Sequence, residues 1–421
     1  MLYHLAVQWL APLEARDDRT TDFRTFSQDL LIMATWTETR SELSASSDVS
    51  SQKQTKSRID SLDVLRGVAV LMIFVVNVKM MANGYNHYVT RSLWEGKAAT
   101  WIAFFHGELV HGQFVTIFTA LFGAGLALLL GREDSLPLPI VLRRLFWLAV
   151  FGGLHLIFLR EGDILIWYAL AGFVAVPFAR LKGATVLGLG LAVQLAAYVH
   201  YALVPISEPE ASAILWSSVR DAHLEVSEIM LGTLGDQISA RMGAASYYMI
   251  DLFFLGGVWI DTLGVMLIGM GLLKSGFLGG QLSLKSYATW AAIGLLICAS
   301  GHILRILLAE GSDWERIILD VASYSYRFGG ALVWTSLIVA AVSSGWKATA
   351  FMAVGRTAFT VYILQSVIGL LLFSSLGLGL FGQLSLGVLM LVTAAVWAFF
   401  LIAAPLSPTF DLVPLNGYGA H

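Results

Sequence analysis

Long apolar segments constrain the fold of this chain more than any other feature. Crossing the hydrocarbon core of a bilayer takes about 20 consecutive, mostly apolar residues, and we find ten such stretches in the 421 residues. They are residues 62–82, 104–130, 140–160, 164–181, 184–205, 247–273, 286–309, 326–344, 351–375 and 384–404. The sequence therefore predicts an all-α, polytopic integral membrane helical bundle with about 10 transmembrane helices.

The composition excludes the main alternatives to a membrane protein. Only 13% of the residues are charged and 57% are hydrophobic, whereas soluble domains carry about 25% and 45–50%. A net charge of −3 offers no basic face for nucleic acid. The single cysteine, Cys298, lies in an apolar run, which argues against disulfides and thiolate metal sites. We expect the lipid bilayer as the principal partner and no nucleic acid, and the oligomeric state stays open.

Basic residues predict the orientation of the bundle. Lys and Arg concentrate in one set of short loops, which predicts that both termini are cytoplasmic. The long, acidic segment 206–246 then becomes an extracytoplasmic loop between two five-helix halves, residues 58–205 and 247–404. The halves show no internal repeat of the kind that many transporters contain.

The N-terminal segment differs from the rest of the chain. Residues 1–57 are polar and end in a Ser-rich run, and such a composition cannot bury enough apolar surface to fold alone. We expect a disordered extension. Met33 is a candidate for the true start of the protein.

Ionisable residues inside the predicted spans are candidate functional residues, because each costs about 2.5–3.5 kcal/mol at a helix centre. In the first span, Asp63, Arg66 and Asn77 lie on one helical stripe. Asp63 and Arg66 can pair at the inner end, and Asn77 lies about 16 Å further out. The alternative is that the pair is an interfacial anchor and that Asn77 makes a hydrogen bond between helices.

Acidic residues in the sixth predicted span favour a transporter. Asp251 lies near its outer end and Asp261 near its middle, and either could be a proton or cation site. His302 and Arg305 share a face of the next span and could bind an anionic group. The alternative for each aspartate is a hydrogen bond to a neighbouring helix.

A metal site is not predicted. His106 and His111 are five residues apart, which places them about 140° apart on a helix, unlike the spacing of four in zinc proteases. No third ligand is implied by the sequence.

Several short segments, in order along the chain, resemble the YeiB-type family of bacterial membrane proteins (domain of unknown function 418). The resemblance covers roughly residues 58–404, and it implies a location in the bacterial plasma (inner) membrane. The matching segments are Asp60–Gly67 followed by Asn77, Phe114, Leu121–Gly125, Arg143–Leu145, Gly153–His155, Gly162–Leu165, Tyr168–Ala169, Gly355–Arg356, Tyr362 and Gln365–Ser366. From these segments we take a set of candidate substrate- or donor-binding residues. They are Asp63, Arg66, Arg143, Arg144, His155, Asp163, Arg356 and Gln365.

The first helix of that family is similar to one in a wider group of transmembrane acyltransferases. In that group an Arg-Gly pair is followed, eleven positions after the Arg, by His or Asn, and here Arg66 is followed by Asn77. The branch with Asn resembles heparan-glucosaminide acetyltransferases, whose acyl-transfer histidine lies a little further on. His87 is the nearest candidate, at a spacing off by one.

The resemblance therefore implies His87 and Asn77 as catalytic residues of an acyl transfer. Arg66 or the Arg143–Arg144 pair would hold the phosphates of an acyl-CoA donor, and the acceptor would be an envelope glycan or lipid. No other cofactor is evident. Three functions remain open: an acyltransferase, a transporter or permease that uses Asp251 and Asp261, and a non-catalytic membrane scaffold.

The C-terminal tail, residues 405–421, departs from the pattern of the family. Members usually end in a phrase close to F-R-x-G-P-x-E-W-L-W-R, and a neighbouring reading frame here can encode FRFGPAEWLWRA. We expect that a frameshift produced the present tail, with an ordinary divergent tail as the alternative. Such a segment is excluded from reasoning about the fold.

Overall fold

The computed structural model describes residues 59–83, 110, 112–131, 135–160, 162–207, 230–246, 249, 257–307 and 313–406. The chain divides into two units, Met1–Ser57 and Arg58–His421. All of the described residues belong to the second unit, so the predictions for residues 1–57 and for the tail from residue 407 onward lie outside them.

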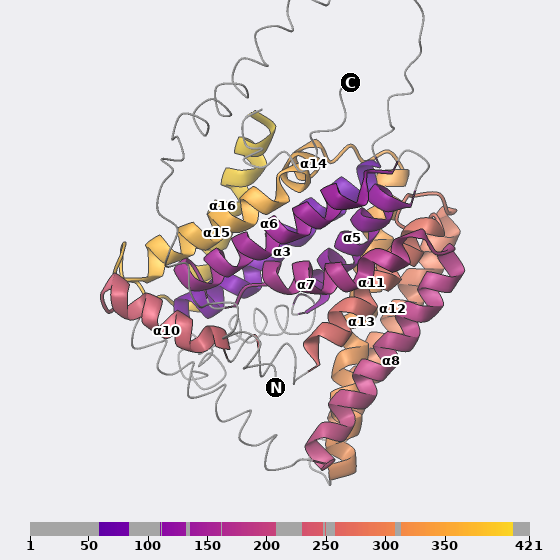
Figure 1. Ribbon diagram of the computed structural model, residues 1–421, viewed down its shortest axis with the longest axis horizontal. Helices are drawn as coiled ribbons and strands as arrows, with labels where there is room; N and C mark the ends of the chain where they lie inside the picture. Colours follow the sequence, from indigo (N-terminus) through magenta and orange to yellow (C-terminus); the bar gives the residue numbers. More distant parts are fainter. Residues whose placement is uncertain are drawn as a thin grey trace, which may run out of the picture. The chain divides into compact units, whose positions relative to one another are not determined.

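The described residues are helical and contain no strand, which confirms the predicted all-α membrane architecture (Figure 1). The helices are α3 (Asp60–Asn83), α5 (Gln113–Leu130), α6 (Leu138–Phe158), α7 (Leu165–Ala175), η5 (Val176–Arg180), α8 (Gly183–Ser207), α10 (Leu234–Ser246), α11 (Val258–Lys274), α12 (Leu284–Leu307), α13 (Asp313–Ser343), α14 (Thr349–Arg356), α15 (Ala358–Phe373) and α16 (Leu386–Leu406). Each of the ten predicted spans overlaps at least one of them.

Seven of these helices are long and apolar enough to cross a bilayer by length and composition, among the residues that the structure describes. They are α3, α5, α6, α8, α12, the second half of α13, and α16. Helices α14 and α15 form an eighth candidate that is bent by 83° at the junction between Arg356 and Ala358. The apolar segment Leu165–Arg180 and helix α11 are shorter, so the count of ten spans stays a prediction.

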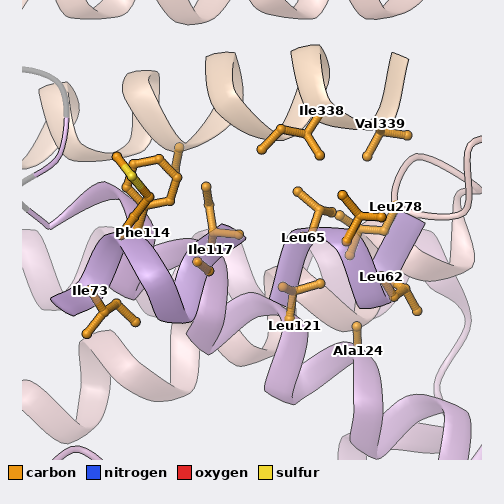
Figure 2. Close-up of a cluster of buried hydrophobic side chains, with 14 of the residues drawn as sticks. Leu62, Leu65, Ile73, Phe114, Ile117, Leu121, Ala124, Leu278, Ile338 and Val339 are labelled. Atoms are coloured by element: carbon orange, nitrogen blue, oxygen red, sulfur yellow. The ribbon is translucent and has the colours of Figure 1, made fainter. Parts of the chain in front are cut away.

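Helix α3 is central to the packing of the bundle. It contacts α5, α13, α14, α15 and α16, and most of its apolar side chains are buried. Figure 2 shows Leu62 and Leu65 of α3, Leu121 of α5 and the Ile338–Val339 pair of α13, which belong to one apolar cluster. This packing fixes the position of the polar residues that α3 carries.

Small residues allow other helices to approach closely, as expected in membranes. Helices α5 and α11 cross where a Cβ on Gly123 would lie 2.0 Å from the carbonyl oxygen of Met266. At the same crossing a Cβ on Gly269 would lie 1.9 Å from the carbonyl oxygen of Ala120. A larger residue at either position would push the two helices apart.

Candidate functional site

Three polar side chains form a continuous chain inside the bundle. His155 Nε2 lies 2.8 Å from Ser366 Oγ, and His155 Nδ1 lies 2.9 Å from Asp163 Oδ1. The second contact has the separation of an ion pair, but its N–H is not aligned on the oxygen as in an ideal hydrogen bond. All three residues are only 1–3% exposed. A serine, a histidine and an aspartate in this order make up the general pattern of an activated hydroxyl.

The turn between α6 and α7 brings Asp163 to His155. His155 lies in the last turn of α6, and Asp163 comes two residues before α7 begins. Asp163 Oδ2 accepts a hydrogen bond of 2.8 Å from the backbone N–H of Ile166, in the first turn of α7. That N–H has no acceptor within its own helix, so the bond fixes the carboxylate and leaves Oδ1 facing the imidazole.

Gly152 makes this arrangement possible. A Cβ at Gly152 would lie 2.4 Å from the nitrogen of Ile166 and 2.9 Å from Asp163 Oδ2. No side chain fits between α6 and the start of α7 at this position. The neighbouring Gly153 has open space around it, so a side chain would fit at Gly153 but not at Gly152.

Further polar groups surround the three residues. The ring of Tyr362 lies 5.1 Å from the imidazole of His155, between ring centroids. Tyr362, Gln365 and Ser366 lie within about 100° of one face of α15. Within the described part of the chain, neither the oxygen nor the nitrogen of the Gln365 amide has a hydrogen-bond partner, although the residue is 2% exposed. A buried amide without partners costs free energy, so it is a candidate contact for a ligand.

Helix α10 packs at the C-terminal end of α6. The buried side chain of Arg241 donates to the backbone carbonyl of Phe158, at 3.3 Å, and to Gln237 Oε1, at 3.1 Å. Gln237 in turn donates to Ser375 Oγ just after α15. The predicted extracytoplasmic segment 206–246 therefore holds a helix that ties the ends of α6 and α15 together.

The start of α10 is capped by a reciprocal pair of hydrogen bonds. Both the backbone N–H and the hydroxyl of Thr233 donate to Asp236 Oδ2, at 2.8 and 2.6 Å, and Thr233 Oγ1 accepts from the N–H of Asp236. These bonds hold the pKa of the Asp236 carboxyl below its ordinary value. This is the capping-box arrangement, with aspartate at the third helical position.

A second polar cluster forms at the predicted inner end of the bundle. Arg66 Nη1 lies 2.9 Å from Asp63 Oδ1, and Arg356 Nε lies 3.4 Å from Asp63 Oδ2. The pairing of Asp63 with Arg66 agrees with the prediction, and Arg356 joins from 293 residues away. The Arg66 and Arg356 side chains are 27% and 39% exposed. Each of the two guanidinium groups around Asp63 is a charged donor of the kind that binds phosphate oxygens.

Glycines also bring the inner cluster together. A Cβ on Gly67 would lie 2.0 Å from the carbonyl oxygen of Phe351, and one on Gly355 would lie 1.8 Å from the carbonyl oxygen of Asp63. Helices α3 and α14 therefore touch backbone to backbone beside the arginines.

The other predicted binding and catalytic residues that the structure describes lie on α6 and α3. Arg143 is exposed and Arg144 is half-buried, near the beginning of α6. Arg144 precedes His155 by eleven residues, which corresponds to about 16 Å along the helix. Asn77 is half-buried on α3, one turn before Met81, whose side chain faces Gly369 of α15. His87 lies outside the described residues.

The residues predicted for transport are only partly described. Asp261 is buried and accepts from Gln194 Nε2, at 2.6 Å, and from Arg327 Nη2, at 2.5 Å. His302 is half-buried on α12. Asp251 and the side chain of Arg305 lie outside the described residues, so the structure does not test whether the four come together.

Sequence reasoning missed three features of these sites: the role of Ser366 beside His155, the role of Gly152, and the pairing of Asp261 with Arg327. A signal for the first was present, because Gly153–His155, Gly162–Leu165 and Gln365–Ser366 were among the family-like segments. These three segments meet at one site, and Asp60–Gly67 and Gly355–Arg356 meet at the other.

The comparisons with known proteins agree with that resemblance. Residues 272–407 match the family model "Protein of unknown function (DUF418)". The chain is 29% identical over 334 residues to "Uncharacterized protein YeiB" of Escherichia coli, which covers 74% of this chain and 83% of YeiB. It is 27% identical over 347 residues to "Uncharacterized protein YxaH" of Bacillus subtilis, which covers 75% of this chain and 81% of YxaH.

Proposed function

Since the chain belongs to the YeiB-type family of DUF418 membrane proteins and the names of its relatives state no activity, we propose a function from the residues of the chain itself. We propose that the protein is a membrane-bound acyltransferase. It acts in the bacterial inner membrane and moves an acyl group from a cytoplasmic acyl-CoA to a hydroxyl or amine of an envelope glycan or lipid. The observation that carries this proposal is the buried contact chain from Asp163 through His155 to Ser366.

His155 is the general base of the proposed reaction. Asp163 faces Nδ1 and favours the tautomer with its proton there, which leaves the lone pair of Nε2 free to accept a proton from a hydroxyl. An imidazole can exchange a proton near neutral pH, and a positioned general base contributes about 10²–10⁴-fold to a rate. This assignment replaces His87, the base that the family resemblance implied, with a histidine whose partners are described.

The inner cluster supplies the donor site of the proposal. Arg66 and Arg356 offer partly exposed guanidinium groups that can each bind phosphate oxygens in pairs. Ser366 lies eight residues beyond Ala358, about 12 Å along α15 from the bend that follows Arg356. The extended pantetheine arm of a coenzyme A held at the arginines would span such a separation and present its thioester beside His155.

The test uses the full chain in lipid nanodiscs with radiolabelled acetyl-CoA or octanoyl-CoA. Total membrane lipid and cell-wall glycan serve as the acceptor pool, and the label that moves to either fraction is counted. We expect transfer by the wild type, a loss of about 10²-fold or more in H155Q, and a smaller loss in D163N, which keeps the side-chain volume.

H200Q is the matched control, since it removes another imidazole from a membrane helix, α8. We expect its transfer rate to stay at the wild-type level. If the wild type transfers no label from either donor, or if H155Q transfers at the wild-type rate, the proposal is wrong.

A second candidate function is transport of a small solute, and the buried pair of Asp261 and Arg327 favours it. Ionisable groups within membrane helices mark solute or ion paths in many transporters. Asp261 here is already neutralised by Arg327 and bonded to Gln194, so a solute would have to displace an existing partner. Uptake into proteoliposomes that D261N abolishes, together with undiminished uptake by H155Q, would favour transport over acyl transfer.

A further inference from the structure

We propose that Ser366 carries the acyl group as an ester on its Oγ between the donor and the acceptor. This inference rests on the proposed function and adds to it a covalent intermediate and the residue that forms it. It starts from the position of Ser366 Oγ, which lies 2.8 Å from His155 Nε2, where the hydroxyl that His155 deprotonates has to be.

The hydrogen bonds around Ser366 favour a hydroxyl aimed at the imidazole. Its two neighbouring acceptors are His155 Nε2, at 2.8 Å, and the carbonyl of Tyr362, at 3.3 Å. The tautomer that Asp163 favours makes Nε2 an acceptor, so the shorter contact is a hydrogen bond donated by Ser366. The nucleophile, its base and a group that orients the base are then all present.

The amide of Gln365 is suited to stabilise the charge that develops on the acyl carbonyl. It comes one residue before Ser366 and lies about 60° from Tyr362 around α15, and its Nε2 has no partner among the described residues. A buried N–H group that has no other hydrogen-bond partner can stabilise a negatively charged oxygen that forms beside it, because no existing hydrogen bond has to break first. We assign Gln365 Nε2 as the donor to that oxygen.

The surroundings of Ser366 suit an acyl ester. Tyr362, whose carbonyl lies 3.3 Å from Ser366 Oγ, belongs to an apolar cluster with Leu165 and with Phe74 and Val78 of α3. An apolar environment accommodates a hydrocarbon chain, and exclusion of water protects a reactive ester from hydrolysis.

The proposed sequence of steps balances in atoms and charge. Ser366 Oγ attacks the thioester carbonyl of the donor while its proton moves to His155 Nε2. The C–S bond then breaks, the sulfur of coenzyme A takes that proton, and the acyl group stays on Oγ. The acceptor hydroxyl next attacks the ester, gives its proton to His155, and His155 returns a proton to Ser366 Oγ as the new ester leaves.

A covalent intermediate also fits the geometry of two separated sites. The donor would bind at the predicted inner end beside Arg66 and Arg356, whereas His155 and Ser366 lie towards the predicted outer end beneath α10. With the acyl group held on Ser366, coenzyme A can leave on one side before the acceptor enters from the other. The two substrates then never have to occupy the bundle together.

The experiment traps the intermediate in the absence of an acceptor. Full-length protein in nanodiscs is incubated with radiolabelled acetyl-CoA or octanoyl-CoA, denatured in acid and analysed for protein-bound label by peptide mapping. We expect label on Ser366 that alkaline hydroxylamine releases, as it releases an oxygen ester. We expect S366A to carry none, and S366C to carry a thioester that neutral hydroxylamine releases.

S336A is the matched control, because Ser336 is an equally buried serine of another helix, α13, and it should label as the wild type does. Thermal unfolding of S366A verifies that the variant is folded. If S366A transfers acyl groups to the acceptor pool at the wild-type rate, or if the label maps to another residue, the covalent role of Ser366 is wrong while the proposed function stands. If the wild type transfers no acyl group at all, the proposed function fails first.

Discussion

His155 on α6 and Ser366 on α15 are 211 residues apart in the sequence, yet their side chains are within 2.8 Å of each other in the structure. The contact joins the N-terminal half of the bundle to the C-terminal half, and both side chains are buried. Buried polar groups in a membrane protein need partners. Here the partners form a chain that ends in the hydroxyl of Ser366, and the proposals above rest on that chain.

The glycine beside Asp163 provides a test of how this site is built. We predict that G152A destabilises the protein by about 1–3 kcal/mol, as overpacking typically does, because the added methyl would lie 2.4 Å from the nitrogen of Ile166. G153A is the control, since its methyl would enter open space and should change stability by no more than about 0.5 kcal/mol. Thermal unfolding in detergent measures both. Equal effects from the two substitutions would contradict the close packing described here.

Arg66 and Arg356 should contribute to the binding of the acyl-CoA donor and not to the chemical step. We predict that R66Q and R356Q each raise the KM for acyl-CoA about tenfold, the equivalent of about 1.4 kcal/mol, with a smaller change in kcat. K347Q removes an exposed charge from the short loop before α14 and serves as the control for general surface potential. A fall in kcat with an unchanged KM would show that these arginines do not bind the donor.

Most of the fold could be predicted from the sequence, because ten long apolar segments permit little besides a helical membrane bundle. The boundaries of α6 and α12 agree with the predicted spans to within a few residues. The bend of 83° after Arg356 was not predicted, because the predicted span 351–375 runs across the break and Gly355–Thr357 interrupts its apolar residues only briefly. The packing of α3 against α14 could not be predicted either. The helical period of the sequence indicates the face on which a residue lies, but not the helix that packs against that face.

The candidate site was only partly predictable for the same reason. The pairing of Asp63 with Arg66 follows from helical spacing alone. The pairing of Arg356 with Asp63 and the contact of His155 with Ser366 depend on which helices are neighbours. Gly152 gave no signal of its own in a chain with 40 glycines.

The pair of Asp261 and Arg327 yields a prediction about stability. We expect D261N to destabilise the protein by about 3 kcal/mol, towards the low end for a broken buried pair, because the Arg327 side chain keeps 22% exposure. The double variant D261N/R327Q removes both charges and should recover part of the loss. Chemical denaturation of the purified wild type and of both variants measures these changes. No recovery in the double variant would contradict a direct pairing of the two charges.

Helix α10 should respond to acid. The pKa of Asp236 is lower in the folded protein than in the unfolded chain, because Thr233 donates to its carboxylate. The stabilising contribution is therefore fully present above the unfolded pKa of about 3.9, and it is lost as the pH falls through the lower folded value. The protection of the α10 amides against hydrogen exchange, expressed relative to the intrinsic rate at each pH, should fall below about pH 4 in the wild type. It should be less dependent on pH in D236N, and identical pH profiles would contradict the capping role.

The most direct test of the central claim is an experimental structure of the protein in a nanodisc with a non-hydrolysable thioether analogue of octanoyl-CoA. We predict density for the phosphates beside Arg66 and Arg356. We also predict that the carbon that replaces the thioester carbonyl lies between His155 Nε2, Ser366 Oγ and the amide of Gln365. Density for the analogue at the pair of Asp261 and Arg327, or no bound analogue at saturating concentration, would contradict the assignment of an acyl-transfer site to His155.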